Sequence, residues 1–91
     1  MYLHFRASTS MKITLLPEQE KMLSSKEKIE RVCTRKDVWA YDIYDGDQLV
    51  GFALVRLFED KEFFLWNYAI DCNYQNRGYG TAALREFIAF M

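Results

Sequence analysis

Hydrophobic and polar residues alternate along several stretches of the chain, and a period of two is typical of strands. The pattern predicts strands over residues 12–16, 38–44, 48–58 and 62–71, with turns at 45–47 and 59–61 between the last three. Residues 48–58 are apolar on both faces, as expected of a central strand covered by helices on each side. Gly51 within this strand predicts a bulge or a close backbone approach.

Helical spacing occupies the region between the first two predicted strands. Pro17 suits the first turn of a helix, and apolar residues recur at helical spacing from there to Lys36. Ser24 and Ser25 interrupt this pattern, and a serine is a good helix N-cap. We therefore expect two short helices within residues 17–36.

A last helix is expected from Tyr79 to Met91. Its predicted buried stripe consists of Leu84, Phe87, Ile88 and Met91. The strand at 62–71, which precedes it, is predicted to place Phe64, Trp66, Tyr68 and Ile70 on one face and Phe63, Leu65, Asn67 and Ala69 on the other.

These elements predict one domain over residues 11–91. Residues 1–10 show no clear period and are expected to be an N-terminal extension. The order strand, two helices, three strands, helix predicts an α/β (α+β) fold, with a mostly antiparallel central sheet and helices on both of its faces.

Composition excludes several classes of protein. The 91 residues are 51% hydrophobic and 16% aromatic, which rules out a disordered chain. Twelve basic and 13 acidic side chains predict no attraction to nucleic acid, and no apolar run approaches the roughly 20 residues of a membrane span. Two cysteines and one histidine predict neither a metal site nor a disulfide framework, so we expect a cytoplasmic protein.

The segment after the last strand carries the candidate chemistry. Gly78 and Gly80 allow a ligand to approach the backbone closely and permit φ > 0, and Arg77 adds a fork of donors. The helix that follows leaves its first N–H groups without intrahelical partners, so the segment can hold a phosphate or pyrophosphate. The alternative interpretation is that the two glycines only shape a tight strand-to-helix turn.

Two better-known phosphate sites are excluded. Six residues separate Asp71 from Gly78, and neither a second parallel strand nor an acidic residue about twenty positions later is present, so the glycines do not form a dinucleotide-binding fingerprint. No Gly-Lys-Ser/Thr sequence occurs, which excludes a P-loop.

The run Gln75-Asn-Arg-Gly-Tyr-Gly80 resembles the acyl-CoA-binding motif Gln/Arg-x-x-Gly-x-Gly/Ala of the GNAT superfamily of N-acyltransferases. Further segments, beginning at Leu16, Ala40, Gln48 and Leu65, resemble the branch that includes bacterial polyamine acetyltransferases. The resemblance covers roughly residues 11–91, and its specific part is the motif.

This resemblance implies an N-acetyltransferase that uses acetyl-CoA as co-substrate and acetylates a primary amine, a polyamine in that branch, by direct attack on the thioester. The residues implied in CoA binding are Ile70, Cys72, Gln75, Asn76, Arg77, Gly78, Tyr79, Gly80 and Thr81. Ile70 and Cys72 are expected to pair with the pantetheine arm through their backbones. Asn67 and Tyr68 are candidates near the reacting groups, and Glu27 and Glu30 are candidates for contact with the amine.

The acidic hairpins point in the same direction as the resemblance. Over residues 42–62 the chain has only two basic side chains, Arg56 and Lys61, but six acidic ones: Asp42, Asp45, Asp47, Glu59, Asp60 and Glu62. An acidic rim would favour a cationic amine, although hairpin turns are commonly acidic for solvation alone.

The sequence departs from the family at its C-terminal end. A GNAT domain normally continues with a fifth strand, a helix whose tyrosine often acts as general acid, and a hairpin, so we expect a fragment or a natural truncation. The open edge of strand 62–71 predicts self-association as a homodimer. A CoA-binding or dimerising module without activity of its own is therefore the alternative function.

Overall fold

The computed structural model describes residues 2–58 and 62–90 and shows one four-stranded antiparallel sheet in the order β1-β2-β3-β4. The strands are β1 (Leu3–Ser8), β2 (Val38–Asp45), β3 (Gln48–Phe58) and β4 (Glu62–Ile70). The helices are α1 (Pro17–Met22), α2 (Lys26–Val32) and α3 (Tyr79–Phe90). This architecture confirms the predicted fold class.

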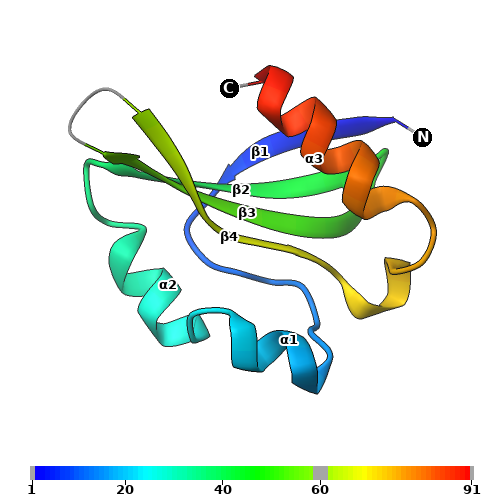
Figure 1. Ribbon diagram of the computed structural model, residues 1–91, viewed down its shortest axis with the longest axis horizontal. Helices are drawn as coiled ribbons and strands as arrows, with labels where there is room; N and C mark the ends of the chain where they lie inside the picture. The colour runs from blue at the N-terminus through cyan, green and yellow to red at the C-terminus, as the bar shows by residue number, and fades with distance from the viewer. Residues whose placement is uncertain (1, 59–61, 91) are drawn as a thin grey trace.

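Helices cover both faces of the sheet, with α1 and α2 on one side and α3 on the other (Figure 1). A hydrophobic cluster that includes Ile43, Val50 and Phe87 fills the α3 side. A second cluster that includes Ile29, Phe52 and Leu54 fills the α1 and α2 side. The prediction that strand 48–58 is covered on both faces is confirmed, because its residues contribute to both clusters.

The first strand does not lie where the pattern placed it. Residues 12–16 are not a strand, and β1 (Leu3–Ser8) comes from the segment that was predicted to be an extension. Thr14 is held by two hydrogen bonds to the chain beyond β4: its N–H donates to Asp71 Oδ2 and its carbonyl accepts from Cys72 N–H, both at 2.8 Å. Met11 and Ile13 alternate because the extended segment is buried on one side, not because it belongs to the sheet.

The two short helices are confirmed, with Ser25 accepting from Lys28 N–H at 3.2 Å as the N-cap of α2. The β2–β3 turn is also confirmed, and Gly46 within it has a positive φ of 59°. The second turn, at 59–61, lies outside the described residues.

Gly51 fulfils both predictions made for it. The register between β2 and β3 shifts beside it, between Ile43 and Tyr44. A Cβ atom on Gly51 would lie 2.9 Å from the carbonyl oxygen of Ala69 on β4. Glycine is therefore required where β3 passes the C-terminal end of β4.

A second bulge changes the predicted faces of β4. Leu54 pairs with Asn67 and Val55 pairs with Leu65, so Trp66 is the extra residue. Tyr68 and Ile70 pack with Leu65 on the α3 side, whereas Trp66 packs with Ala69 on the other side. Strict alternation was wrong at this point because a bulge turns two consecutive side chains toward one face.

The buried stripe of α3 also differs from the prediction. Ala83 and Phe87 are buried, whereas Ile88 is 67% exposed and Met91 lies outside the described residues. Phe87 packs edge-on against Phe5 of β1 and Tyr41 of β2. The helix therefore packs against β1, the edge strand that the sequence pattern did not predict. This contact determines which side of α3 is buried.

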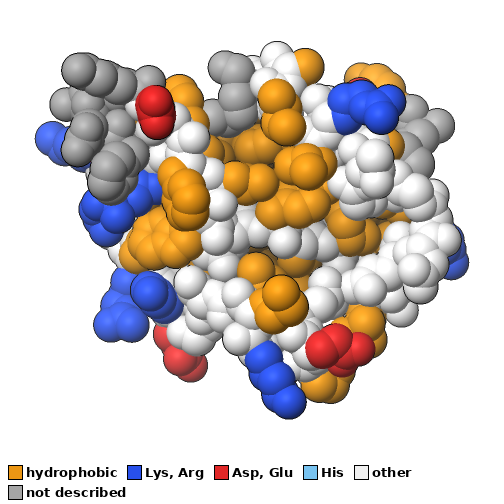
Figure 2. Space-filling view, in the orientation of Figure 1, with side chains coloured by type: hydrophobic (Ala, Val, Ile, Leu, Met, Phe, Trp, Pro, Cys, Tyr) orange, Lys and Arg blue, Asp and Glu red, His pale blue; other side chains and the backbone are white. Residues whose placement is uncertain are grey.

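Among the described helices, none is long and apolar enough to cross a membrane. Figure 2 shows hydrophobic side chains gathered over the middle of the sheet beside α3, so part of this apolar surface remains in contact with solvent.

Candidate functional site

The loop between β4 and α3 begins with a short 3-10 helix at Cys72–Tyr74. Asp71 caps this turn: its Oδ1 accepts from Asn73 N–H at 2.9 Å, while its Oδ2 accepts from Thr14 N–H. Asp71 is 8% exposed and is thus part of the framework that fixes where the loop leaves the sheet.

The loop then reverses direction through two residues with positive φ, Asn76 at 62° and Gly78 at 83°. Gly80 is not among them, because it already belongs to α3. The expectation that both glycines supply positive φ is therefore correct for Gly78 only. A Cβ atom on Gly80 would meet nothing within 4 Å, so no packing of the chain itself requires glycine there.

The backbone N–H groups of residues 76–81 are the central feature of this loop. Across the described residues, no carbonyl or side chain of the protein accepts a hydrogen bond from them. The first helical hydrogen bond of α3 runs from Ala82 N–H to the Gly78 carbonyl at 3.2 Å. A row of free donors at the positive end of a helix dipole is suited to an anion such as a pyrophosphate.

Three tyrosine hydroxyls attach this loop to the sheet. Tyr68 of β4 donates to the Gly80 carbonyl at 2.7 Å, and Tyr74 donates to Gln48 Oε1 at 2.6 Å. Tyr79 donates to Asp45 Oδ2 at 2.5 Å. The roles of Tyr74 and of Asp45 were missed by sequence analysis, since their partners lie 26 and 34 residues away and no local pattern signals them.

These hydrogen bonds set the protonation of the groups involved. Burial raises the pKa of Tyr68 to about 12. The hydrogen bond from Tyr79 lowers the pKa of Asp45, and acceptance by Asp45 raises the pKa of Tyr79. At neutral pH both hydroxyls are therefore protonated and the carboxylate is ionised, so the hydrogen bonds that hold the loop persist.

The free edge of β4 borders the loop. Asp71 N–H donates inward to the Val50 carbonyl at 2.8 Å, so the backbone groups of Tyr68 and Ile70 point to the open edge by alternation. The Ile70 carbonyl accepts from the side chains of Gln19 at 3.3 Å and Gln75 at 3.2 Å. Gln75 thus acts here through its side chain, fastening the loop to β4.

A cavity of about 290 Å³ lies between this edge and the start of α3. Its lining includes Tyr68 and Ile70 from β4, Asn76 from the loop, Gly80 from the first turn of α3, and Gln19 from α1. The free amides and the free strand edge therefore border one cavity, and that arrangement fits an extended ligand with an anionic group at one end.

Cys72, Thr81 and Arg77 take other positions. The N–H of Cys72 donates to the Thr14 carbonyl and is therefore not available to a ligand. Pairing of pantetheine with the Cys72 backbone stays a prediction for the carbonyl group. Thr81 lines a neighbouring open cavity with Leu84 and Arg85. Arg77 is exposed, and its guanidinium lies 5.7 Å from the centre of the Tyr74 ring.

Asn67 lies on the opposite face of the sheet from the loop. It is 3% exposed, and its Oδ1 accepts from Ser24 N–H at 3.0 Å. Its amide thus ties the α1–α2 connection to β4. Glu27 and Glu30 are exposed on α2, which lies at the other end of the molecule from the loop in Figure 1.

Comparisons with known proteins identify the fold and the family. The chain resembles a solved structure from Bacteroides thetaiotaomicron described as an acetyltransferase of the GNAT family, with a TM-score of 0.66 and 22% identity, over 84% of this chain and 42% of that one. The chain thus spans less than half the length of this structural neighbour, and no curated protein matches it. The model of the acetyltransferase (GNAT) family matches residues 7–91. By that match, the chain belongs to the GNAT acetyltransferase family.

Proposed function

We propose that this chain binds acetyl-CoA and takes part in transfer of the acetyl group to a primary amine. The observation that carries the proposal is the row of free N–H groups at residues 76–81, at the start of α3 and beside the open edge of β4. Family membership supports acetyl-CoA as the donor. The cavity between β4 and α3 supports the proposal that the pantetheine arm binds there.

In this proposal the chain binds and orients the donor mainly through its backbone. The amides of residues 76–81 hold the pyrophosphate, and the outward backbone groups of Tyr68, together with the N–H of Ile70, pair with the pantetheine amides as a neighbouring strand would. The Ile70 carbonyl is already engaged by the side chains of Gln19 and Gln75. The thioester is thereby held on the strand for direct attack by a neutral amine. The hydroxyl of Tyr68 is committed to the Gly80 carbonyl, so its role is to position the loop.

A polyamine as the acceptor is supported by the resemblance of the sequence. Support from the acidic hairpins is reduced, because Asp42 is buried against Lys12 at 3.0 Å and Asp45 is engaged by Tyr79. Glu59 and Asp60 lie outside the described residues. The open edge of β4 supports a homodimer, which sedimentation at micromolar concentration tests. A cytoplasmic location remains part of the proposal, and the two free cysteines suit a reducing compartment.

Gly80→Ala tests the binding site. A Cβ atom there has open space in the free protein, so we expect unchanged stability, but it would obstruct a ligand lying on the amides. CoA affinity measured by calorimetry should fall at least about tenfold, a loss of about 1.4 kcal/mol. Gly46→Ala is the matched control: this turn glycine has a positive φ, so the variant loses stability and keeps its CoA affinity.

Turnover separates the proposed enzyme from a CoA-binding module without activity. Acetyl-CoA is incubated with the chain and a panel of amines that includes spermidine, and release of the CoA thiol is followed. Release above the amine-free background supports acetyl transfer. CoA binding without any release would identify the module, and an unchanged melting temperature at millimolar CoA would show that the loop is only a turn.

A further inference from the structure

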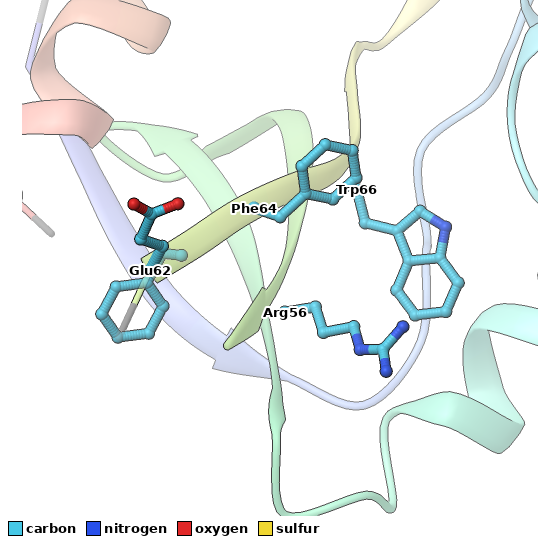
Figure 3. A pocket seen from close by; sticks show the side chains of 5 residues that line it. Arg56, Glu62, Phe64 and Trp66 are labelled. Carbon is cyan, nitrogen blue, oxygen red and sulfur yellow. The ribbon is translucent and has the colours of Figure 1, made fainter. Parts of the chain in front are cut away.

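A second and larger cavity lies at the other end of β4. Its volume is about 450 Å³, within the range of roughly 300–1,000 Å³ that small-molecule sites occupy. It is lined by Arg56, Glu62, Phe63, Phe64 and Trp66. Figure 3 shows Phe64, Trp66 and Arg56 grouped at one end of the cavity, with Glu62 at the other end.

The aromatic side chains of this cavity are unusually exposed. Phe63 is 53% and Phe64 is 60% exposed, although neighbouring residues on a strand normally place one side chain in the core. Phe63 packs edge-on against Trp39 of β2, with ring centres 5.7 Å apart. Because Phe63 and Phe64 leave opposite faces of β4, the cavity wraps around the open edge of the strand.

The bulge in β4 brings cations to the same place. Trp66, the extra residue, faces α2, and the Lys28 Nζ atom lies 5.5 Å from the centre of its ring. The guanidinium carbon of Arg56 lies 5.9 Å from the same centre. The indole is thus already in contact with two positive groups from the chain. At the left of Figure 2, hydrophobic side chains lie between Lys and Arg side chains.

Acidic groups also lie near these charges: Glu62 lines the cavity at the end away from Arg56 (Figure 3). Asp37 is shared between Arg35 at 2.7 Å and Arg56 at 3.3 Å. Lys28 is exposed and forms no ion pair within the part of the chain that the structure describes. A polycation entering at Trp66 would meet Lys28 and Arg56, whereas a carboxylate would be attracted by them.

We propose that this cavity binds the amine acceptor, and that the acceptor combines an aromatic or large apolar body with a carboxylate, as an aromatic amino acid does, in place of the polyamine that the sequence resemblance implies. The role as acceptor site rests on the proposed function; the class of ligand rests on the aromatic lining and on Lys28 and Arg56. This cavity and the proposed acetyl-CoA cavity between β4 and α3 adjoin the same strand on either side of the bulge at Trp66. A ligand body would pack on Phe64 while its carboxylate meets the cationic end.

Calorimetry on the full chain with three probes tests the ligand class. The probes are L-phenylalanine, L-phenylalaninamide, which lacks the carboxylate, and spermidine. We expect phenylalanine to bind about fivefold more tightly than phenylalaninamide, the size of effect that an exposed ion pair produces. Spermidine should bind most weakly of the three.

Lys28→Glu should remove the preference for phenylalanine over phenylalaninamide. Lys21→Glu, on exposed α1, has the same change of charge and should keep the preference, because Lys21 is not among the residues around Trp66. Spermidine binding tighter than phenylalanine, equal effects of the two variants, or no binding of phenylalanine would overturn the proposed ligand class.

The same titrations separate this proposal from the proposed function. Acetyl-CoA binding measured in parallel reports the loop at α3 alone. If phenylalanine binds as expected while acetyl-CoA does not, the ligand class stands and the acetyl-transfer assignment fails. If both bind and phenylalanine releases no CoA thiol, its place as acceptor is overturned while the donor site stands.

Discussion

The two ends of β4 border cavities of different construction. At the C-terminal end the surface is mainly backbone: free N–H groups of residues 76–81 and the outward groups of Tyr68 and Ile70. At the N-terminal end it consists of side chains, with three aromatic rings and flanking cations. The strand is the same, and the bulge at Trp66 separates its two halves.

The difference fits the two kinds of recognition proposed above for one strand. A backbone site depends on loop conformation, so it requires glycine and anchoring tyrosines and depends little on the identity of other side chains. A side-chain site can change its ligand through single substitutions. We infer that the site at the C-terminal end of β4 is constrained by the fold, whereas the aromatic cavity at its N-terminal end can be altered without unfolding the protein.

The largest effect on stability is expected from Gly51→Ala, beside the C-terminal end of β4. Its Cβ atom would lie 2.9 Å from the Ala69 carbonyl oxygen and 3.0 Å from Ile70 Cδ1, so β4 must move. We expect a loss of about 1–3 kcal/mol in urea unfolding. Gly80→Ala is the control and should change stability by less than about 0.5 kcal/mol, because nothing lies within 4 Å of the new atom. Equal effects of the two substitutions would contradict this account.

Tyr68→Phe should have the next largest effect. It removes the hydrogen bond to the Gly80 carbonyl, with an expected loss of about 1 kcal/mol and weaker CoA binding. Because the folded pKa of about 12 exceeds the ordinary value of 10, the contribution of Tyr68 is complete below pH 10 and is lost as pH rises toward 12. The free energy of unfolding, measured from pH 8 to 11.5, should therefore fall less steeply with pH for the variant than for the unchanged chain. Parallel curves would contradict this role of Tyr68.

Phe64→Ala probes the other end of the strand. The side chain is 60% exposed, so the free energy of unfolding should change by no more than about 0.5 kcal/mol. Loss of the aromatic wall should nevertheless weaken phenylalanine binding and leave acetyl-CoA binding unchanged. A large loss of stability, measured in urea, would mean that this end is structural and would break the comparison.

Tyr79→Phe should have the smallest effect, confined to the titration of Asp45. The hydrogen bond from Tyr79 lowers the pKa of Asp45, so its removal should raise that pKa toward the ordinary value. The stability linked to this carboxylate is present above the ordinary pKa and is lost as pH falls, and the variant should lose less of it. Side-chain NMR of Asp45 measures the change, with Tyr74→Phe as a control that keeps the Tyr79 hydrogen bond.

Local patterns predicted most of the secondary structure. Pro17 and Ser25 marked the two short helices, Gly46 marked a hairpin, and the glycines at 78 and 80 marked the loop. These signals are reliable because each reflects a backbone conformation that few residues adopt. Asn76 escaped the analysis because asparagine tolerates positive φ without the sequence signal that glycine gives.

Errors arose where alternation had more than one physical cause. Met11 and Ile13 alternate like a strand although their segment is tied to residues 71–72, and β1 pairs with β2 although its own pattern is weak. An edge strand can be mixed in composition because its pairing comes from the backbone. The faces of β4 were shifted by a bulge that depends on the partner strand.

By itself, the sequence determined the fold class, the residues at which the helices begin and the position of the glycine loop, because glycines, caps and turn residues act within a few positions of one another. Tertiary structure decided which N–H groups stay free, which tyrosines hold the loop, and that Lys28 and Arg56 meet at Trp66. These contacts join residues far apart in the chain. Their partners are fixed only when strand register and bulges set the distances.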